Sequence, residues 1–185
     1  MENRACAKRF SKEIKRMDIV KAQQQDLPDV LDIISSCIKH MESREIYQWD
    51  ETYPDAEIIK EDIGNGHSYV MKDGGRCIAY VAINDVYEDE VPLFRQVNWS
   101  LNGEKTLYIH RLCVHPDYQG RGIAKKMLGF IEDTAAKNGY ISIRLEAFGG
   151  NETALKMYEK SGYKKVGESY YRSIDLPCYC FDKVL

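Results

Sequence analysis

Residues 107–138 decide the fold, and they read LYIHRLCVHPDYQGRGIAKKMLGFIEDTAAKN. The apolar run 107–114 predicts a strand, and the helical spacing of apolar residues over 122–137 predicts a helix. Between them lies a glycine turn, 119–124. Glycines there let an anion approach the backbone N–H groups that open the helix, which lack intrahelical partners and carry the positive end of the helix dipole. The turn therefore predicts a pyrophosphate site.

A second segment, residues 151–163, reads NETALKMYEKSGY and lies one predicted strand further on. With both segments the chain resembles the GNAT superfamily of N-acetyltransferases. The first segment matches the family's Q/R-x-x-G-x-G/A motif through Gln119, Gly122 and Ala124. The second matches N-x-x-A-x-x-x-Y-x-x-x-G-F/Y through Asn151, Ala154, Tyr158, Gly162 and Tyr163. Two motifs in this order indicate fold and cofactor, but they say little about the acyl acceptor.

The order of predicted elements extends the resemblance from about Met17 to the C-terminus. We expect strands near 18–20, 68–71, 77–83, 141–146, 164–171 and 179–184, helices near 26–41, 55–63 and 152–161, and a loop-like insert over 88–105. The length suits one core. The prediction is a mixed α/β fold: a GNAT-like central mixed β-sheet with splayed central parallel strands, flanked by helices. It assigns 17–185 to a single N-acetyltransferase domain and 1–16 to an N-terminal extension.

The composition of the chain limits the cellular compartments and the classes of partner that we expect. Net charge is −3 and the pI is about 5.9, with Lys and Arg spread along the chain, so we expect no nucleic-acid partner. No apolar run approaches the roughly 20 residues of a membrane span, so we expect no membrane partner. The six cysteines show no zinc-like or redox spacing, which favours reduced thiols in a cytoplasmic protein without metal. Cys178 and Cys180 as a metal or regulatory thiol pair are the alternative, and monomer and homodimer both stay open.

The resemblance implies acetyl-CoA as the cosubstrate. Its pantetheine arm would bond to the exposed backbone of a central strand, in the manner of strand addition. The residues assigned to the cofactor are Leu112, Cys113 and Val114 on the strand, Gln119, Gly120, Arg121, Gly122, Ile123 and Ala124 in the turn, and Asn151. Asn151 is also expected to cap the helix that it begins.

The resemblance also assigns the catalytic side chains. Tyr158 matches the family's general acid, since a phenol with an ordinary pKa of about 10 can donate a proton to a leaving thiolate; the alternative is a packing aromatic. His110 is the candidate general base, directly or through water, because family members that acetylate arylalkylamines place a histidine at the matching point. A hydrogen-bonded structural histidine is the alternative, and Glu146 or a water is the rival base.

Strand alternation places Leu112 and Val114 on the face of His110 and places Arg111 on the opposite face. A charge in a central strand needs a partner, and Glu146 on the neighbouring strand is the expected one.

The acceptor site is expected in the N-terminal half and the insert. Trp49, Tyr53 and Trp99 are the candidate substrate-binding residues, since aromatic rings beside acidic residues can hold a cationic amine. The predicted function is direct acetyl transfer from acetyl-CoA to a primary amine of a small molecule. The alternatives are a protein or peptide N-acetyltransferase and a non-catalytic acyl-CoA-binding regulatory domain.

Overall fold

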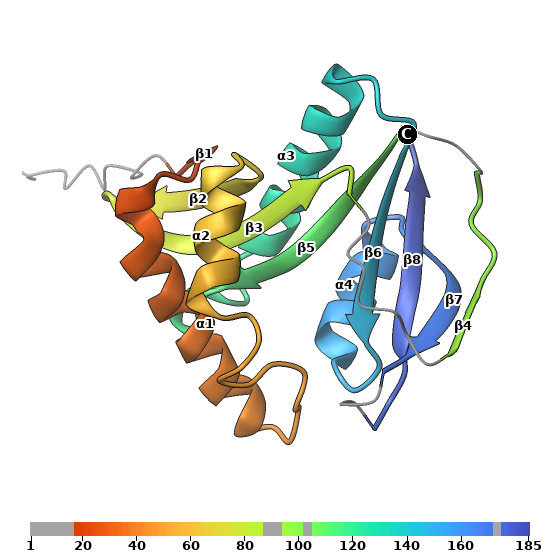
Figure 1. Cartoon of the computed structure of the whole chain (residues 1–185), viewed down its shortest axis with the longest axis horizontal. Helices are drawn as coiled ribbons and strands as arrows, with labels where there is room; N and C mark the ends of the chain where they lie inside the picture. Colours follow the sequence, from red (N-terminus) through yellow and green to blue (C-terminus); the bar gives the residue numbers. More distant parts are fainter. Residues whose placement is uncertain (1–16, 87–93, 102–104, 172–174) are drawn as a thin grey trace, which may run out of the picture.

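A computed structural model describes residues 17–86, 94–101, 105–171 and 175–185. Within these ranges the chain forms an eight-stranded sheet in the order β1-β2-β3-β5-β6-β8-β7-β4, with helices on both faces (Figure 1). The strands are β1 (Asp18–Lys21), β2 (Ser68–Asp73), β3 (Arg76–Asn84), β4 (Phe94–Val97), β5 (Thr106–Val114), β6 (Ser142–Phe148), β7 (Lys164–Tyr170) and β8 (Cys178–Val184). The α-helices are α1 (Leu27–Glu42), α2 (Ala56–Gly64), α3 (Ile123–Lys137) and α4 (Glu152–Lys160).

The two central strands, β5 and β6, run parallel but stay together only at their first residues. They pair at Thr106 with Ser142, at Leu107 with Ile143 and at Tyr108 with Arg144. Beyond these pairs the strands diverge into a V (Figure 1), as the predicted splay requires. The gap leaves part of the backbone edge of β5 without a strand neighbour, and this opening positions the site.

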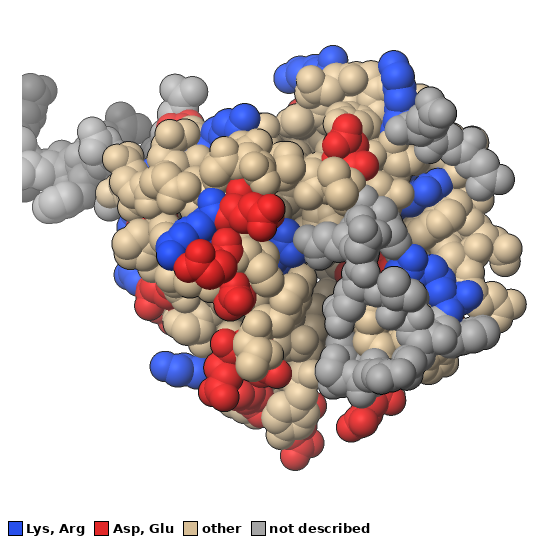
Figure 2. Space-filling model, viewed as in Figure 1, with Lys and Arg blue, Asp and Glu red and all other residues tan. Residues whose placement is uncertain are grey.

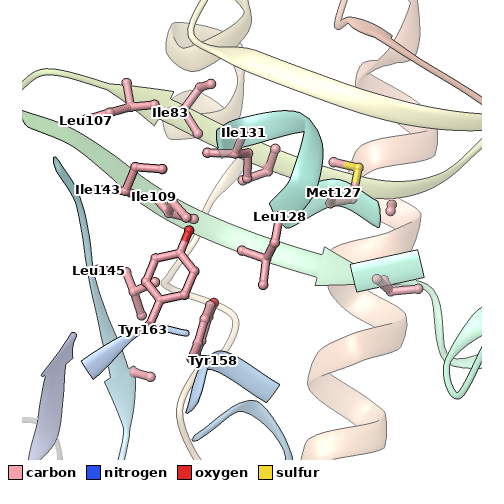
Figure 3. Packing of buried hydrophobic residues seen from close by; sticks show 14 of the residues in the cluster. Ile83, Leu107, Ile109, Met127, Leu128, Ile131, Ile143, Leu145, Tyr158 and Tyr163 are labelled. Atoms are coloured by element: carbon pink, nitrogen blue, oxygen red, sulfur yellow. The ribbon is translucent and has the colours of Figure 1, made fainter. Parts of the chain in front are cut away.

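The two larger hydrophobic clusters of the core lie on opposite faces of the sheet, each covered by helices. On one face α1 and α2 pack over β3 through residues such as Val30 and Ile33, which recur at helical spacing. On the other face α3 and α4 cover β5 and β6, and Figure 3 shows Leu128 and Ile131 of α3 against Ile109 of β5. The gap between β5 and β6 is therefore lined from both faces.

A bulge in β5 at Arg111 changes which side chains share a face. Arg111 has φ of 54°, in the left-handed region that is uncommon for residues other than glycine, and the register with β3 shifts opposite it. Leu112 and Val114 consequently pack on the α3 side with Ile109, while His110 and Arg111 both reach the α1 and α2 side. The predicted alternation along this strand was wrong, because a bulge adds one residue to it.

The predicted helices and strands are otherwise confirmed, apart from the insert. Residues 94–97 of that insert form β4, which pairs antiparallel with β7 at the edge of the sheet. Gly167 permits this close approach, since a Cβ there would lie 2.2 Å from the carbonyl oxygen of Gln96. The predicted extension over 1–16 lies outside the described residues.

The surface of the described residues carries both signs of charge. Figure 2 shows Lys and Arg side chains interspersed with Asp and Glu side chains over α1 and α2. Within the described ranges, every helix is too short or too polar to cross a membrane. In the same ranges, no three His, Cys, Asp or Glu side chains gather as a metal site requires.

Candidate functional site

A cavity of about 780 Å³ occupies the V between β5 and β6. It is lined by both strands, by the C-terminal half of α1 and the loop after it, and by the first residues of α3 and α4. All but one of the predicted site residues line it: Trp49, Tyr53, Trp99, His110, Leu112, Cys113, Val114, Gln119, Gly120, Gly122, Ile123, Ala124, Asn151 and Tyr158. The exception is Arg121, whose guanidinium donates to the Asp117 carbonyl at 2.7 Å and lies over the Tyr118 ring.

The glycine turn has the geometry that an anion site needs. Gly120 and Gly122 have φ of 73° and 76°, and a Cβ built on either would meet nothing within 4 Å, so both face open space. Gly122 is the N-cap of α3 and has no side chain with which to cap the first N–H groups of the helix. These donors are left for a ligand at the positive end of the helix dipole, and the turn fits a pyrophosphate.

The end of β5 is held by side chains on both sides. The Val114 carbonyl accepts from Gln119 Nε2 at 2.9 Å and from Cys37 Sγ at 3.2 Å, so Gln119 serves the strand here. The interaction with the Cys37 thiol, followed by burial, raises the pKa of Cys113, and the interaction with the Cys113 thiol lowers the pKa of Cys37. The Cys113 thiol thus keeps its proton at neutral pH.

Tyr158 of α4 is buried, yet it lines the cavity. Its ring packs at 5.8 Å from the Tyr163 ring and at 5.9 Å from the Phe181 ring, and Figure 3 shows Tyr158 and Tyr163 side by side beneath β5. Burial, and secondly the nearby Cys113 thiol, raise the pKa of Tyr158 above its ordinary value. The phenol is therefore held in its protonated form at neutral pH.

His110 faces the cavity from the opposite side of the sheet. Its Nε2 lies 3.1 Å from Asn84 Oδ1 on β3, and its ring centroid lies 6.3 Å from that of Tyr108. Both His110 and Tyr158 line the same cavity, one from each face of the splayed strands. A proton acceptor and a proton donor can thus act on a group held between β5 and β6.

The buried charge of Arg111 is paired with α2. Its Nε and Nη2 each lie 2.9 Å from the Asp62 carboxylate, which also accepts from Tyr80 OH at 2.8 Å. Arg111 Nη1 donates to Tyr53 OH at 3.2 Å, which ties this network to the cavity wall. The prediction that Glu146 pairs with Arg111 was wrong, because the bulge turns Arg111 toward α2.

Glu146 has a cation of its own. Its carboxylate accepts from Arg95 Nη2 at 3.0 Å and from Tyr171 OH at 2.7 Å, so both oxygens are engaged. Burial and then the bond to Glu146 raise the pKa of Tyr171. Arg95 and Tyr171 were missed in the sequence, because Arg95 lies in the supposed loop and reaches Glu146 only through the pairing of β4 with β7.

The remaining predicted residues occupy the acceptor side and the start of α4. The Arg144 guanidinium lies over the Trp99 ring at 4.3 Å, and Trp49 packs against the cluster under α1. Asn151 Oδ1 accepts from Ala154 N at 3.1 Å, which confirms the predicted helix cap.

Comparison with known proteins adds the family. A family model described as "Acetyltransferase (GNAT) family" matches residues 32–163. N-acetyltransferase family 8 member 2 of Rattus norvegicus is 28% identical over 120 residues, which is 64% of this chain and 48% of the rat protein. The chain thus spans about half the length of that relative. N-alpha-acetyltransferase RimI of Mycobacterium tuberculosis is 28% identical over 133 residues, 69% of this chain and 73% of that protein.

Solved structures share the fold. A GNAT-family acetyltransferase from Streptococcus agalactiae superposes with a TM-score of 0.74 at 22% identity, covering 91% of this chain and 95% of that one. The PaiA N-acetyltransferase from Thermoplasma acidophilum, solved in complex with coenzyme A, gives a TM-score of 0.69 at 16% identity, covering 92% and 99%. At these identities the likeness establishes the fold.

Proposed function

Because the chain belongs to the acetyltransferase (GNAT) family, we propose that it transfers an acetyl group from acetyl-CoA directly to a primary amine of a small molecule. The observation that carries the proposal is the cavity in the V, which joins the open glycine turn to His110 and Tyr158. The two ends of this cavity suit the two substrates. The turn suits the pyrophosphate, and the aromatic wall near Trp49 and Trp99 suits an acceptor.

The glycine turn and the strand edge hold the acetyl donor in this proposal. The N–H groups after Gly122 bind the pyrophosphate, and the edge of β5 from Leu112 to Val114, which lies beyond its last pair with β6, runs along the pantetheine arm. This places the thioester between the splayed strands, where His110 and Tyr158 face it from either side. Proximity of this kind is a large part of catalysis for a two-substrate reaction.

His110 takes the proton of the attacking amine, directly or through water, so that the nitrogen lone pair is free to attack. Tyr158 gives its proton to the sulfur as the carbon–sulfur bond breaks. Its raised pKa suits this role, since the phenol is protonated when the thiolate leaves. Cys113 keeps its proton, because the interaction with the Cys37 thiol and burial raise its pKa, so transfer proceeds without an acyl-enzyme.

A protein or peptide N-terminus is the second candidate acceptor, favoured by the 28% identity to a protein named as an N-alpha-acetyltransferase. Release of coenzyme A thiol from acetyl-CoA, measured over amino acids, arylalkylamines, polyamines, aminoglycosides and short peptides, separates the candidates. We expect the highest kcat/KM with a small amine. Turnover of peptides alone would move the acceptor to the second candidate. Binding of acetyl-CoA without turnover of any amine would instead indicate a regulatory domain.

The glycine turn gives a direct test of acetyl-CoA binding. Gly122→Val adds a side chain where the pyrophosphate is expected, so we expect the Kd for acetyl-CoA to rise by about 10- to 100-fold, the loss of one or two charge-assisted hydrogen bonds. Gly75→Val is the matched control, because Gly75 also has a positive φ (91°) and open space but lies in the β2–β3 turn. Calorimetry on both variants measures the difference. Equal affinities in two folded proteins would remove the pyrophosphate from this turn.

His110→Gln tests the base. We expect the variant to turn over about 10²-fold more slowly than the parent, because glutamine keeps a similar bulk but cannot take the proton of the amine. His67→Gln, outside the cavity lining, is the control and should keep the parent's rate. A rate in His110→Gln equal to the parent's would assign the base to Glu146 or a water.

A further inference from the structure

Arg144 is a buried cation in the wall of the cavity. It lies on β6 beside Tyr108, in the last pair before the strands separate, and it is 7% exposed. Its Nη2 donates to the Leu101 carbonyl, and its Nη1 lies 3.5 Å from Tyr108 OH. Its Nε is buried without a hydrogen-bond partner. A guanidinium has five N–H donors, so most of its capacity is unused by the described residues.

No carboxylate among the described residues lies within 4 Å of this guanidinium. In this respect Arg144 differs from the other two arginines in the cavity wall. Arg95 and Arg111 line the same cavity, and each pairs with a carboxylate at 3.0 and 2.9 Å. Asp182 lies opposite Arg144 on β8, but its two oxygens accept from the backbone N–H and the hydroxyl of Ser100, at 2.6 and 2.9 Å. Among the described residues, the Arg144 charge is therefore compensated by a carbonyl, a hydroxyl and an aromatic ring. Because a buried charge is costly without an ion-pair partner, binding of an anion beside Arg144 should be favourable.

Arg144 lies near the candidate general base, with Tyr108 between the two side chains. The Tyr108 hydroxyl touches Arg144, and the Tyr108 ring lies 6.3 Å from the His110 ring, so one aromatic side chain separates the guanidinium from the candidate base. Glu146, the nearest carboxylate along the cavity-facing side of β6, is already neutralised by Arg95. The Arg144 guanidinium therefore lies on the same cavity wall as the candidate base, with the Tyr108 side chain between them.

We propose that Arg144 binds the carboxylate of the acceptor, so that the acceptor is an amino acid whose carboxylate lies beside its reacting amine. A guanidinium can pair with a carboxylate through two parallel N–H···O bonds, which fixes orientation as well as charge. Polyamines carry no anion for this contact. A peptide N-terminus has an amide where the carboxylate would be. The Trp99 ring and the Tyr108 hydroxyl frame the bound carboxylate.

This inference rests on the proposed amine acetylation, and matched acceptors separate the two. The probes are phenylalanine, phenylalaninamide and phenethylamine, and methionine, methioninamide and 3-(methylthio)propylamine, each assayed with acetyl-CoA by thiol release. We expect the parent to prefer each acid over its amide by at least about tenfold in kcat/KM. This factor corresponds to the free energy of one charge-assisted hydrogen bond. Arg144→Met should lower kcat/KM for the acids by about 10- to 100-fold and leave the amides within about twofold.

Three controls make the result specific. Arg144→Lys keeps the charge and should retain an intermediate preference for acids, because an ammonium cannot form the two-point contact. Arg76→Met removes an exposed arginine outside the cavity lining and should leave every ratio unchanged. Melting curves report whether each variant is folded, and a rise in the parent's melting temperature on adding the acids, absent in Arg144→Met, reports binding without turnover.

The possible results distinguish failure of the carboxylate contact from failure of the proposed acetylation. Equal turnover of acids, amides and amines by the parent, or an equal loss for all three in Arg144→Met, would overturn the carboxylate contact and leave amine acetylation standing. No turnover of any probe or of the wider amine panel would refute the proposed function. In that case the change in melting temperature alone decides whether Arg144 holds a carboxylate.

Discussion

Asp62→Ala is expected to lower the free energy of unfolding by about 3 to 5 kcal/mol, the loss typical of breaking a buried ion pair from one side. The side chains of Asp62 and Arg111 are 8% and 3% exposed, and the carboxylate accepts from Arg111 twice and from Tyr80 once. Without it the guanidinium stays buried and loses the two hydrogen bonds that its Nε and Nη2 donate to the carboxylate. Urea denaturation followed by circular dichroism measures the change.

Asp32→Ala provides the matched control. Asp32 also pairs with an arginine, Arg76, at 2.8 Å, but both side chains are more than half exposed, so the loss should be far smaller. The double variant Asp62→Ala/Arg111→Met should be more stable than the sum of the single losses predicts, because it removes both members of the buried ion pair together. A loss in Asp62→Ala no larger than in Asp32→Ala would mean that the buried network contributes little.

Tyr158→Phe is expected to lower kcat by about 10²- to 10⁴-fold, the range for loss of a general acid, with little change in the Kd for acetyl-CoA. The variant removes one hydroxyl and keeps the ring that packs between Tyr163 and Phe181. Tyr163→Phe is the control, since Tyr163 is also buried and lies 5.8 Å away but does not line the cavity. Single-turnover thiol release and calorimetry measure the two quantities.

The pKa of Tyr158 adds a pH test to this variant. Burial raises that pKa above the ordinary value of about 10, so the phenol keeps its proton as pH rises from 7 to 10. We therefore expect no alkaline fall in the parent's kcat from this residue within that range. Activity in Tyr158→Phe equal to that in Tyr163→Phe would leave Tyr158 as a packing residue.

The amino-acid sequence is sufficient to predict those helices, turns and caps whose signals lie a few residues apart. Helical spacing after Gly122, the glycine pairs in the turns and the cap at Asn151 each depend on residues a few positions apart, and the structure places helices, turn and cap as predicted. The two motifs also indicated the family and, through it, the splay of the central strands. All predicted site residues except Arg121 line one cavity.

The pairing of the buried charges could be seen only in the three-dimensional structure. Arg111 and Asp62 are 49 residues apart and Arg95 and Glu146 are 51 apart, so no local pattern relates them. The bulge at Arg111 moves the side chains after it to the opposite face from the one predicted. Strand β4 forms through its pairing with β7, which is far from it in the sequence. That no carboxylate of the described residues pairs with Arg144 could not be predicted either, because Asp182 accepts from Ser100, which is 82 residues away in the sequence. Local spacing sets secondary structure, whereas the partner of a buried charge depends on which distant side chains the packed core brings within a hydrogen bond of it.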